Sequence, residues 1–120
     1  MAMLPSMLSS FQNATAASLG LGSSSSVTFN DITVSKTITT PGTTGAQTIN
    51  KAAGRVNAAI AATSLVVTNS LVTANSIVIV KPASNDATGR IISVVPASGS
   101  FTIYFVAPAA EMAIDFLVIN

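Results

Sequence analysis

The sequence predicts an all-β protein, a single antiparallel β-sandwich of about eight strands of the jelly-roll or immunoglobulin-like type. From residue 27 onward, apolar residues alternate with polar ones at a period of two, as in half-buried strands. The runs are short and rich in Val, Ile, Thr and Phe, which favour strands. Pro, Gly and Asn interrupt them about every 8–12 residues, a spacing typical of sandwiches and barrels.

The segment before this region has a different pattern. Residues 1–26 are expected to form an N-terminal arm with a Ser-rich linker, Ser23–Ser26, followed by the sandwich domain at 27–120. Four apolar residues of the arm have the i, i+3, i+4, i+7 spacing of one helix face: Leu4, Met7, Leu8 and Phe11. Because a sandwich fills its core with its own strands, we expect these four side chains to anchor the protein to a partner.

The first strands are expected between Ile32 and Ile60. Residues 32–39 alternate β-branched apolar residues with Thr and Ser, and Pro41-Gly42 is a strong turn signal. Two more strands are expected at 45–51 and 55–60, with Gly54 as a turn or bulge between them. The sequence therefore predicts three strands before the middle of the chain.

Turn residues also delimit the rest of the domain. Five further strands are expected, at Ser64–Thr68, Ile77–Lys81, Ile91–Val95, Phe101–Val106 and Met112–Ile119. Pro82, Pro96 and Pro108 are each expected to end a strand. A turn region is expected at Asn85-Asp86 and Thr88-Gly89. The Ala-rich stretch at 51–62 could be helical, but Gly54 and the neighbouring strands favour a strand there.

The composition favours a subunit of an assembly. Charged residues make up 8% of the chain and hydrophobic residues 49%, whereas a soluble domain has about 25% charged residues. A free monomer usually stays soluble by displaying charge. The strands at 77–80 and 112–119 are apolar on both faces, so we expect a homo-oligomer in which neighbouring copies bury the second face.

Several function classes are excluded or disfavoured by residue type. The chain has no His and no Cys, so imidazole chemistry and disulfides are absent. Five scattered cations and a net charge of +1 do not make a nucleic-acid surface. No apolar run reaches the roughly 18 residues of a membrane span. We therefore expect no enzyme activity, no cofactor or metal, no nucleic-acid partner and no membrane partner.

Two charged pairs are candidate sites. Glu111 and Asp115 are the only close acidic pair, and their spacing in a strand places both on one face. They could serve glycosidic hydrolysis or bind a hard cation, but a solvated face is favoured because no nucleophile or third ligand accompanies them. The opposite face of this strand is the expected core set: Met112, Ile114, Phe116 and Val118. Lys51 and Arg55 could contact an anion or glycan, and exposed charge or an ion pair with a neighbouring subunit is favoured for them.

Short motifs resemble a known family. The strings are GAQTINK at Gly45–Lys51, SLVVTNS at Ser64–Ser70, SGSF at Ser98–Phe101 and FLVIN at Phe116–Asn120. With these motifs, the chain from about residue 37 to its end resembles small virion modules of tailed bacteriophages. The resemblance implies a β-sandwich, found at the tips of tail fibres and in short proteins that decorate heads.

The resemblance and the composition together predict a non-enzymatic structural protein at the surface of a phage particle. The first expectation is a capsid decoration, or cement, protein that binds the head as an oligomer, with a trimer as the expected copy number. Its partners would be further copies of itself and the major capsid protein or another virion protein. The alternative is a tail-fibre or head-fibre module that contacts the host receptor. A start Met, a single domain and no long fibrous segment favour decoration.

Overall fold

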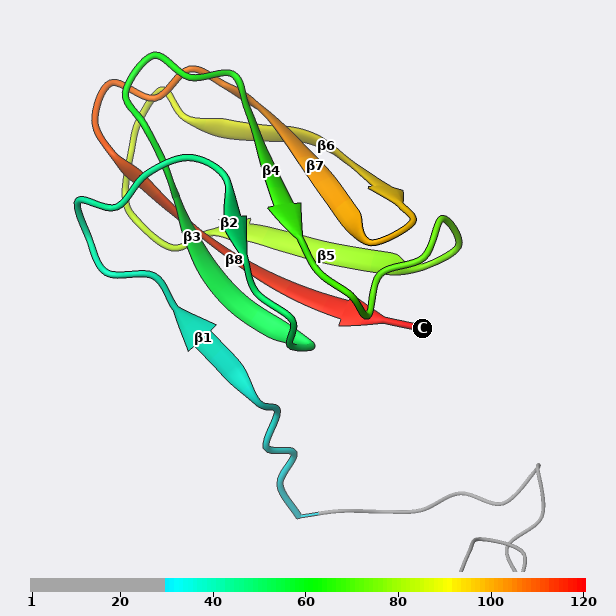
Figure 1. Cartoon of the computed structure of the whole chain (residues 1–120). Helices are drawn as coiled ribbons and strands as arrows, with labels where there is room; N and C mark the ends of the chain where they lie inside the picture. Colours follow the sequence, from blue (N-terminus) through cyan, green and yellow to red (C-terminus); the bar gives the residue numbers. More distant parts are fainter. Residues whose placement is uncertain (1–29) are drawn as a thin grey trace, which may run out of the picture. The chain divides into compact units, whose positions relative to one another are not determined.

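The structure, a computed structural model, describes residues 30–120 and contains eight β-strands in that range (Figure 1). The strands are β1 (Lys36–Ile38), β2 (Gln47–Thr48), β3 (Ala53–Ala58), β4 (Ser64–Thr68), β5 (Ile77–Pro82), β6 (Arg90–Ala97), β7 (Ser100–Val106) and β8 (Met112–Ile119). The described part of the chain holds no helix that could cross a membrane. The arm residues Leu4, Met7, Leu8 and Phe11, and the expected domain boundary after residue 26, lie outside the described residues.

The strands form two four-stranded sheets that pack together, which confirms the predicted eight-stranded sandwich (Figure 1). The first sheet has the order β1-β3-β8-β5, and the second has the order β2-β4-β7-β6. From β1 to β6 the chain changes sheet at every connection. Only β6 and β7 are consecutive and paired, through a tight turn at Gly99, whose φ of 79° suits a residue without a Cβ.

The pairing is mixed in direction, which corrects the purely antiparallel expectation. Four ladders are antiparallel: β3–β8, β5–β8, β4–β7 and β6–β7. The edge pairs β1–β3 and β2–β4 are parallel. Each crossing between sheets reverses the direction of the chain, so strands two apart in sequence run the same way. Where two such strands become neighbours, their ladder is parallel.

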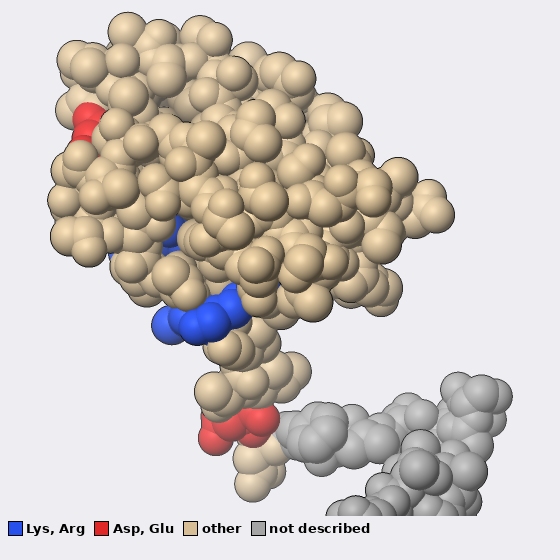
Figure 2. Space-filling model, in the orientation of Figure 1, with Lys and Arg blue, Asp and Glu red and all other residues tan. Residues whose placement is uncertain are grey.

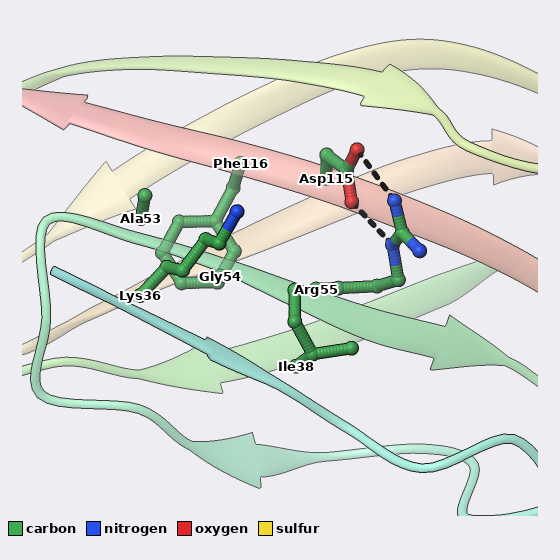
Figure 3. A pocket seen from close by; sticks show the side chains of 7 residues that line it. All are labelled: Lys36, Ile38, Ala53, Gly54, Arg55, Asp115 and Phe116. Atoms are coloured by element: carbon green, nitrogen blue, oxygen red, sulfur yellow. Dashed lines mark hydrogen bonds and ion pairs between the residues drawn. The ribbon is translucent and has the colours of Figure 1, made fainter. Parts of the chain in front are cut away.

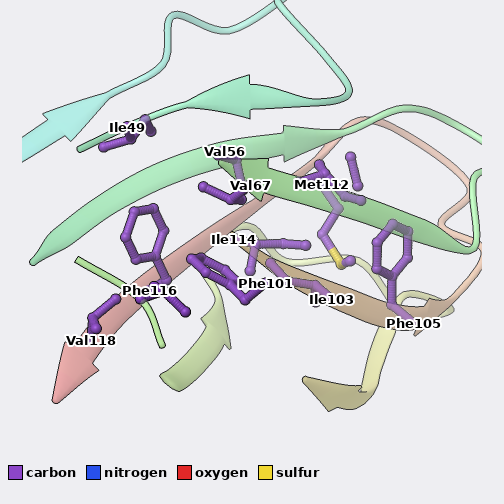
Figure 4. Close-up of a cluster of buried hydrophobic side chains, with 13 residues drawn as sticks. Ile49, Val56, Val67, Phe101, Ile103, Phe105, Met112, Ile114, Phe116 and Val118 are labelled. Carbon is purple, nitrogen blue, oxygen red and sulfur yellow. The ribbon is translucent and has the colours of Figure 1, made fainter. Parts of the chain in front are cut away.

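The core lies between the sheets and comes largely from β7 and β8 (Figure 4). Strand β8 buries every second residue, Met112, Ile114, Phe116 and Val118, as its alternation predicts. Strand β7 buries Phe101, Ile103 and Phe105 in the same way. The rings of Phe101 and Phe116 meet edge to face with centroids 5.0 Å apart, so an aromatic contact joins the two sheets.

The structure corrects the roles predicted for one glycine and two prolines. Gly54 was expected to be a turn or bulge, but it lies inside the regular ladder of β3 with β8. Pro82 and Pro96 were expected to stop strands, but they are members of β5 and β6. Both β5 and β6 are edge strands, where one side of the backbone needs no ladder partner, so proline is tolerated.

The expected strands at the start of the domain are shorter than predicted. Of residues 32–39 only Lys36–Ile38 form β1, and of residues 45–51 only Gln47–Thr48 form β2. Both are sheet edges whose pairing ends where the chain leaves for the other sheet. The helical alternative for 51–62 is wrong, because β3 occupies Ala53–Ala58.

Candidate functional site

Two of the charged side chains that sequence reasoning singled out, Arg55 and Asp115, lie together on the outer face of the first sheet, the face opposite the core. Arg55 on β3, Asp115 on β8 and Lys81 on β5 are directly opposite one another across three adjacent strands. The Asp115 carboxylate accepts two hydrogen bonds from Arg55, from Nε at 2.6 Å and from Nη2 at 3.1 Å (Figure 3). It also accepts one from Lys81 Nζ at 3.0 Å. We call these three residues the charge row.

The charge row keeps Asp115 ionised. The hydrogen bond from Arg55 is the largest influence and lowers the pKa of Asp115 below its usual value, with Lys81 adding to it and partial burial opposing it. The same hydrogen bond raises the pKa of Arg55. A carboxylate held by two cations is a poor proton donor. Asp115 lies on the face opposite the core, as predicted, but its side chain is only 25% exposed and is paired rather than freely solvated.

Glu111 is not part of the charge row and binds the turn after β1 instead. Both of its carboxylate oxygens accept the backbone N–H of Gly42, at 2.9 and 3.1 Å. This contact ties the turn after β1 to the start of β8, and Gly42 has the positive φ of 90° that such a turn requires. Glu111 and Asp115 are therefore bound by different donors, and the structure does not bring them together as an acid–base pair.

Lys51 and Arg55 also separate. Lys51 Nζ donates to the backbone oxygen of Lys36 at 3.4 Å, beside β1. Arg55 pairs with Asp115 of its own chain, so the expected pairing with a neighbouring subunit is not needed. Figure 2 shows Lys and Arg gathered at one part of the visible surface, while most of that surface carries no charge.

Of the shallow hollows that border the charge row, two are lined by Asp115. One, of about 190 Å³, lies over β3 between β1 and β8 and is lined by Lys36, Ile38, Ala53, Gly54, Arg55, Asp115 and Phe116 (Figure 3). The other, of about 250 Å³, lies along β5 and β8. Neither encloses a cluster of groups that could hold a metal, since residues 30–120 contain no group of three acidic, His or Cys side chains.

Beside the charge row lies an aliphatic block on the same face, formed by Ile77, Ile79, Leu117 and Ile119. The β5–β8 register places Ile77 opposite Ile119 and Ile79 opposite Leu117. Ile77 is 62% exposed and Ile79 is 52% exposed. Sequence reasoning found these strands apolar on both faces, but the contiguity of the block depends on the pairing of β5 with β8.

The outer face of the second sheet is uncharged except at its rim. Its exposed large side chains include Val66, Val95 and Tyr104, which lie among Ser and Thr. Arg90, at the start of β6, is the single charged residue in strands β2, β4, β6 and β7. The two faces therefore differ in chemistry, one with charges beside aliphatics and the other almost neutral.

A network of hydrogen bonds around Asp86 connects the loops at one end of the sandwich. Its Oδ1 accepts the N–H and hydroxyl of Thr88 and the N–H of Gly89, and its Oδ2 accepts the N–H of Ala110. The Thr88 hydroxyl and these backbone donors lower the pKa of Asp86 well below its usual value. Sequence reasoning placed a turn here but did not identify Asp86 as its organiser, although Asp two residues before Thr is a signal for such a turn.

Comparisons with known proteins assign no class to this chain. No protein-family model matches the chain. No curated protein and no solved structure matches it either.

Proposed function

We propose that this chain is a non-enzymatic structural protein of a bacteriophage particle, a capsid decoration protein that binds the head as a homo-oligomer. The observation that carries the proposal is the exposure of large apolar side chains on both outer faces, including Ile77, Ile79, Val66, Val95 and Tyr104. Contiguous exposed apolar surface is typical of protein that is covered in an assembly. The sequence motifs that resemble phage virion modules support a phage particle as that assembly.

The chemistry of the site supports a structural role. Asp115 is neutralised by Arg55 and Lys81, and Glu111 binds a backbone N–H, so both carboxylates hold strands and turns together. The chain has no His or Cys to activate a nucleophile. Conservative replacement of either carboxylate, Glu111→Gln or Asp115→Asn, is expected to leave particle binding intact.

The arm is proposed to be the anchor to the particle. Leu4, Met7, Leu8 and Phe11 have the spacing of one helix face. Burial of one large apolar side chain contributes roughly 1.5–3 kcal/mol, and an oligomer that presents several arms gains further by multivalency. The particle partner would be the major capsid protein or another head protein.

Co-sedimentation with undecorated particles tests the proposal. A variant lacking residues 1–22 is expected to remain a folded oligomer and to stay in the supernatant, while the intact chain sediments. The matched control replaces the four residues of Ser23–Ser26 with Ala and should sediment like the intact chain. Full binding by the truncated variant would contradict the anchor.

Two further outcomes would overturn the rest of the proposal. A dilute, soluble monomer in light scattering would contradict the oligomeric subunit. Binding to host cells, with none to heads, would favour the alternative of a tail-fibre or head-fibre module that contacts the receptor.

A further inference from the structure

Strand β5 is an open edge of the first sheet. Its ladder partner is β8, and no other described segment pairs with it. Directly after β5, the N–H of Ala83 bonds to the oxygen of Ala113, in continuation of the β5–β8 register. Because antiparallel pairs alternate, the odd-numbered residues of β5 direct their backbone groups to β8. Val78 and Val80 therefore direct their N–H and C=O groups outward, away from the sheet.

The other three edges are short or interrupted. Strands β1 and β2 have three and two residues. Strand β6 carries a register irregularity between Ile91 and Ser93 and has Pro96 in its ladder, and both features protect an edge against pairing with another chain. Strand β5 is regular from Ile77 onward, and its proline comes only at its last position.

The exposed face beside this edge is apolar where pairing would occur. Ile79 lies opposite Leu117, and both belong to the aliphatic block beside the charge row. The only charge on β5, Lys81, is already bound by Asp115 of its own chain. A partner strand that pairs with β5 would therefore need aliphatic residues, and any charge on it should lie at the end of the pairing away from Lys81.

A second copy of this chain meets that requirement, and we propose that two copies pair antiparallel through β5 about a two-fold axis at Ile79. In this register Val78 of one copy lies opposite Val80 of the other, so the outward backbone groups of both residues find partners. A register centred on Val78 would instead place Val80 opposite Ser76, whose N–H is already bonded to Thr73. A register centred on Val80 would place Val78 opposite Pro82, which has no N–H. The backbone thus selects the register centred on Ile79.

The side chains suit the same arrangement. The two Ile79 side chains meet on the exposed face, and Leu117 of each copy extends the apolar row on either side. Lys81 lies opposite Ile77 of the other copy, where its aliphatic stem can cover that side chain. The two Lys81 ammonium groups start from positions four residues apart along the strand direction, about 14 Å. That separation exceeds the Debye length of about 10 Å at 0.1 M salt, so their repulsion is weak.

This inference rests on the proposal that the chain is an assembly subunit, and it identifies one contact within the oligomer. Because both copies contribute the same strand to this two-fold symmetric contact, it joins copies in pairs. A larger oligomer would combine this pair with a second contact.

Disulfide trapping of the full chain tests the pairing. The chain has no Cys, so Ile79→Cys introduces a single thiol that can bond only to another copy. Opposed residues in a non-hydrogen-bonded antiparallel pair have Cα atoms about 4.5 Å apart, within the range of disulfides. Mild oxidation should give a covalent dimer of Ile79→Cys. The matched control, Ile77→Cys, lies on the same strand and face but opposite Lys81, and should remain largely uncrosslinked.

Light scattering of a second pair of variants provides a test that does not depend on oxidation. Ile79→Lys places two ammonium groups face to face and should lower the measured mass by breaking the β5 contact, while Asn85→Lys, at an exposed loop position, should not. Equal crosslinking of both Cys variants, or an unchanged mass for Ile79→Lys, would overturn the β5 pairing. If the unmodified chain is an oligomer in that case, only this inference fails, whereas a monomeric unmodified chain contradicts the proposed function as well.

Discussion

The ring of Phe116 on β8 occupies the space that a side chain at Gly54 on β3 would need. A Cβ built on Gly54 would lie 2.7 Å from Cε1 and 2.8 Å from Cζ of Phe116, and 3.0 Å from the backbone oxygen of Thr37 (Figure 3). The two residues are directly opposite in the β3–β8 ladder and both face inward. The missing side chain at position 54 thus lets an aromatic ring of one strand lie over the backbone of the next.

Gly54→Ala is therefore expected to destabilise the sandwich. Overpacking of a filled core typically costs about 1–3 kcal/mol, and here the ring also packs edge to face against Phe101. The free energy of unfolding in urea measures the loss. In a double-mutant cycle, Phe116→Leu should reduce the cost of Gly54→Ala. Ala53→Ser, on the outward side of β3, serves as the control, and an equal loss in that variant would contradict the explanation.

Asn57→Ala is expected to loosen the connection that follows β1. Asn57 is 2% exposed, and its Nδ2 donates to the backbone oxygens of Thr40 at 3.0 Å and Thr43 at 3.1 Å. Removal of the amide takes its donor away from these carbonyl groups, and each such hydrogen bond contributes about 0.5–1.5 kcal/mol. Urea unfolding checks the magnitude, and faster amide hydrogen exchange at 39–45 would locate the change. Asn85→Ala, at an exposed position, should have little effect on either measurement.

Asp86→Asn is expected to change the acid stability of the protein. The pKa of Asp86 is lowered in the folded state by Thr88 and by backbone donors, so its contribution is present above the unfolded pKa of about 3.9. That contribution is lost as the pH falls below about 4 through the folded pKa. The variant should be less stable than the unmodified chain at neutral pH, and the difference should shrink in acid.

Thermal unfolding between pH 2 and pH 7 measures this difference in stability between the variant and the unmodified chain. Asp31→Asn is the matched control, because Asp31 is exposed and precedes the first strand. A constant offset between the Asp86→Asn variant and the unmodified chain across that range would show that the ionised carboxylate adds nothing to stability.

Asp115→Asn is expected to weaken the first sheet modestly and in a salt-dependent way. The substitution leaves Arg55 and Lys81 on the same face without the carboxylate between them. Because Arg55 and Lys81 are substantially exposed, the loss should be at most about 1 kcal/mol. Salt near 1 M shortens the Debye length to about 3 Å, so the stability difference should narrow there.

Urea unfolding at low and high salt measures this effect. Lys36→Gln, a charge change on the neighbouring strand β1, controls for general salt effects. A stability loss for Asp115→Asn that is large and independent of salt would mean that packing around Asp115, rather than charge, stabilises this part of the sheet.

Much of the fold could be predicted from local pattern. The strands at Ser64–Thr68 and Met112–Ile119 have the predicted bounds, because each alternates buried and exposed residues between clear turn signals. The inward set of β8 was also predicted, since period two fixes which residues share a face. The four residues proposed as the anchor lie outside the described residues, so their role stays a prediction.

The charge row could not be assembled from the sequence. Arg55 and Asp115 are 60 residues apart, and the four-residue spacings that drew attention, 51 to 55 and 111 to 115, join residues that bind other partners. Strand alternation says that two residues share a face, but the contact across a sheet depends on which strands are neighbours and in what register. That choice is made by the packing of all eight strands together.

The sequence alone determined that this protein is built from strands, where most of them lie, and which residues of β8 enter the core, since these follow from side-chain periodicity and turn chemistry. The tertiary structure decided the order of strands in each sheet, the parallel direction of the two short edge pairs and the contact of Gly54 with Phe116. It also decided that β5 is an open edge beside an aliphatic block. These features depend on contacts between distant segments, and local propensity carries no information about which segment becomes the neighbour of another.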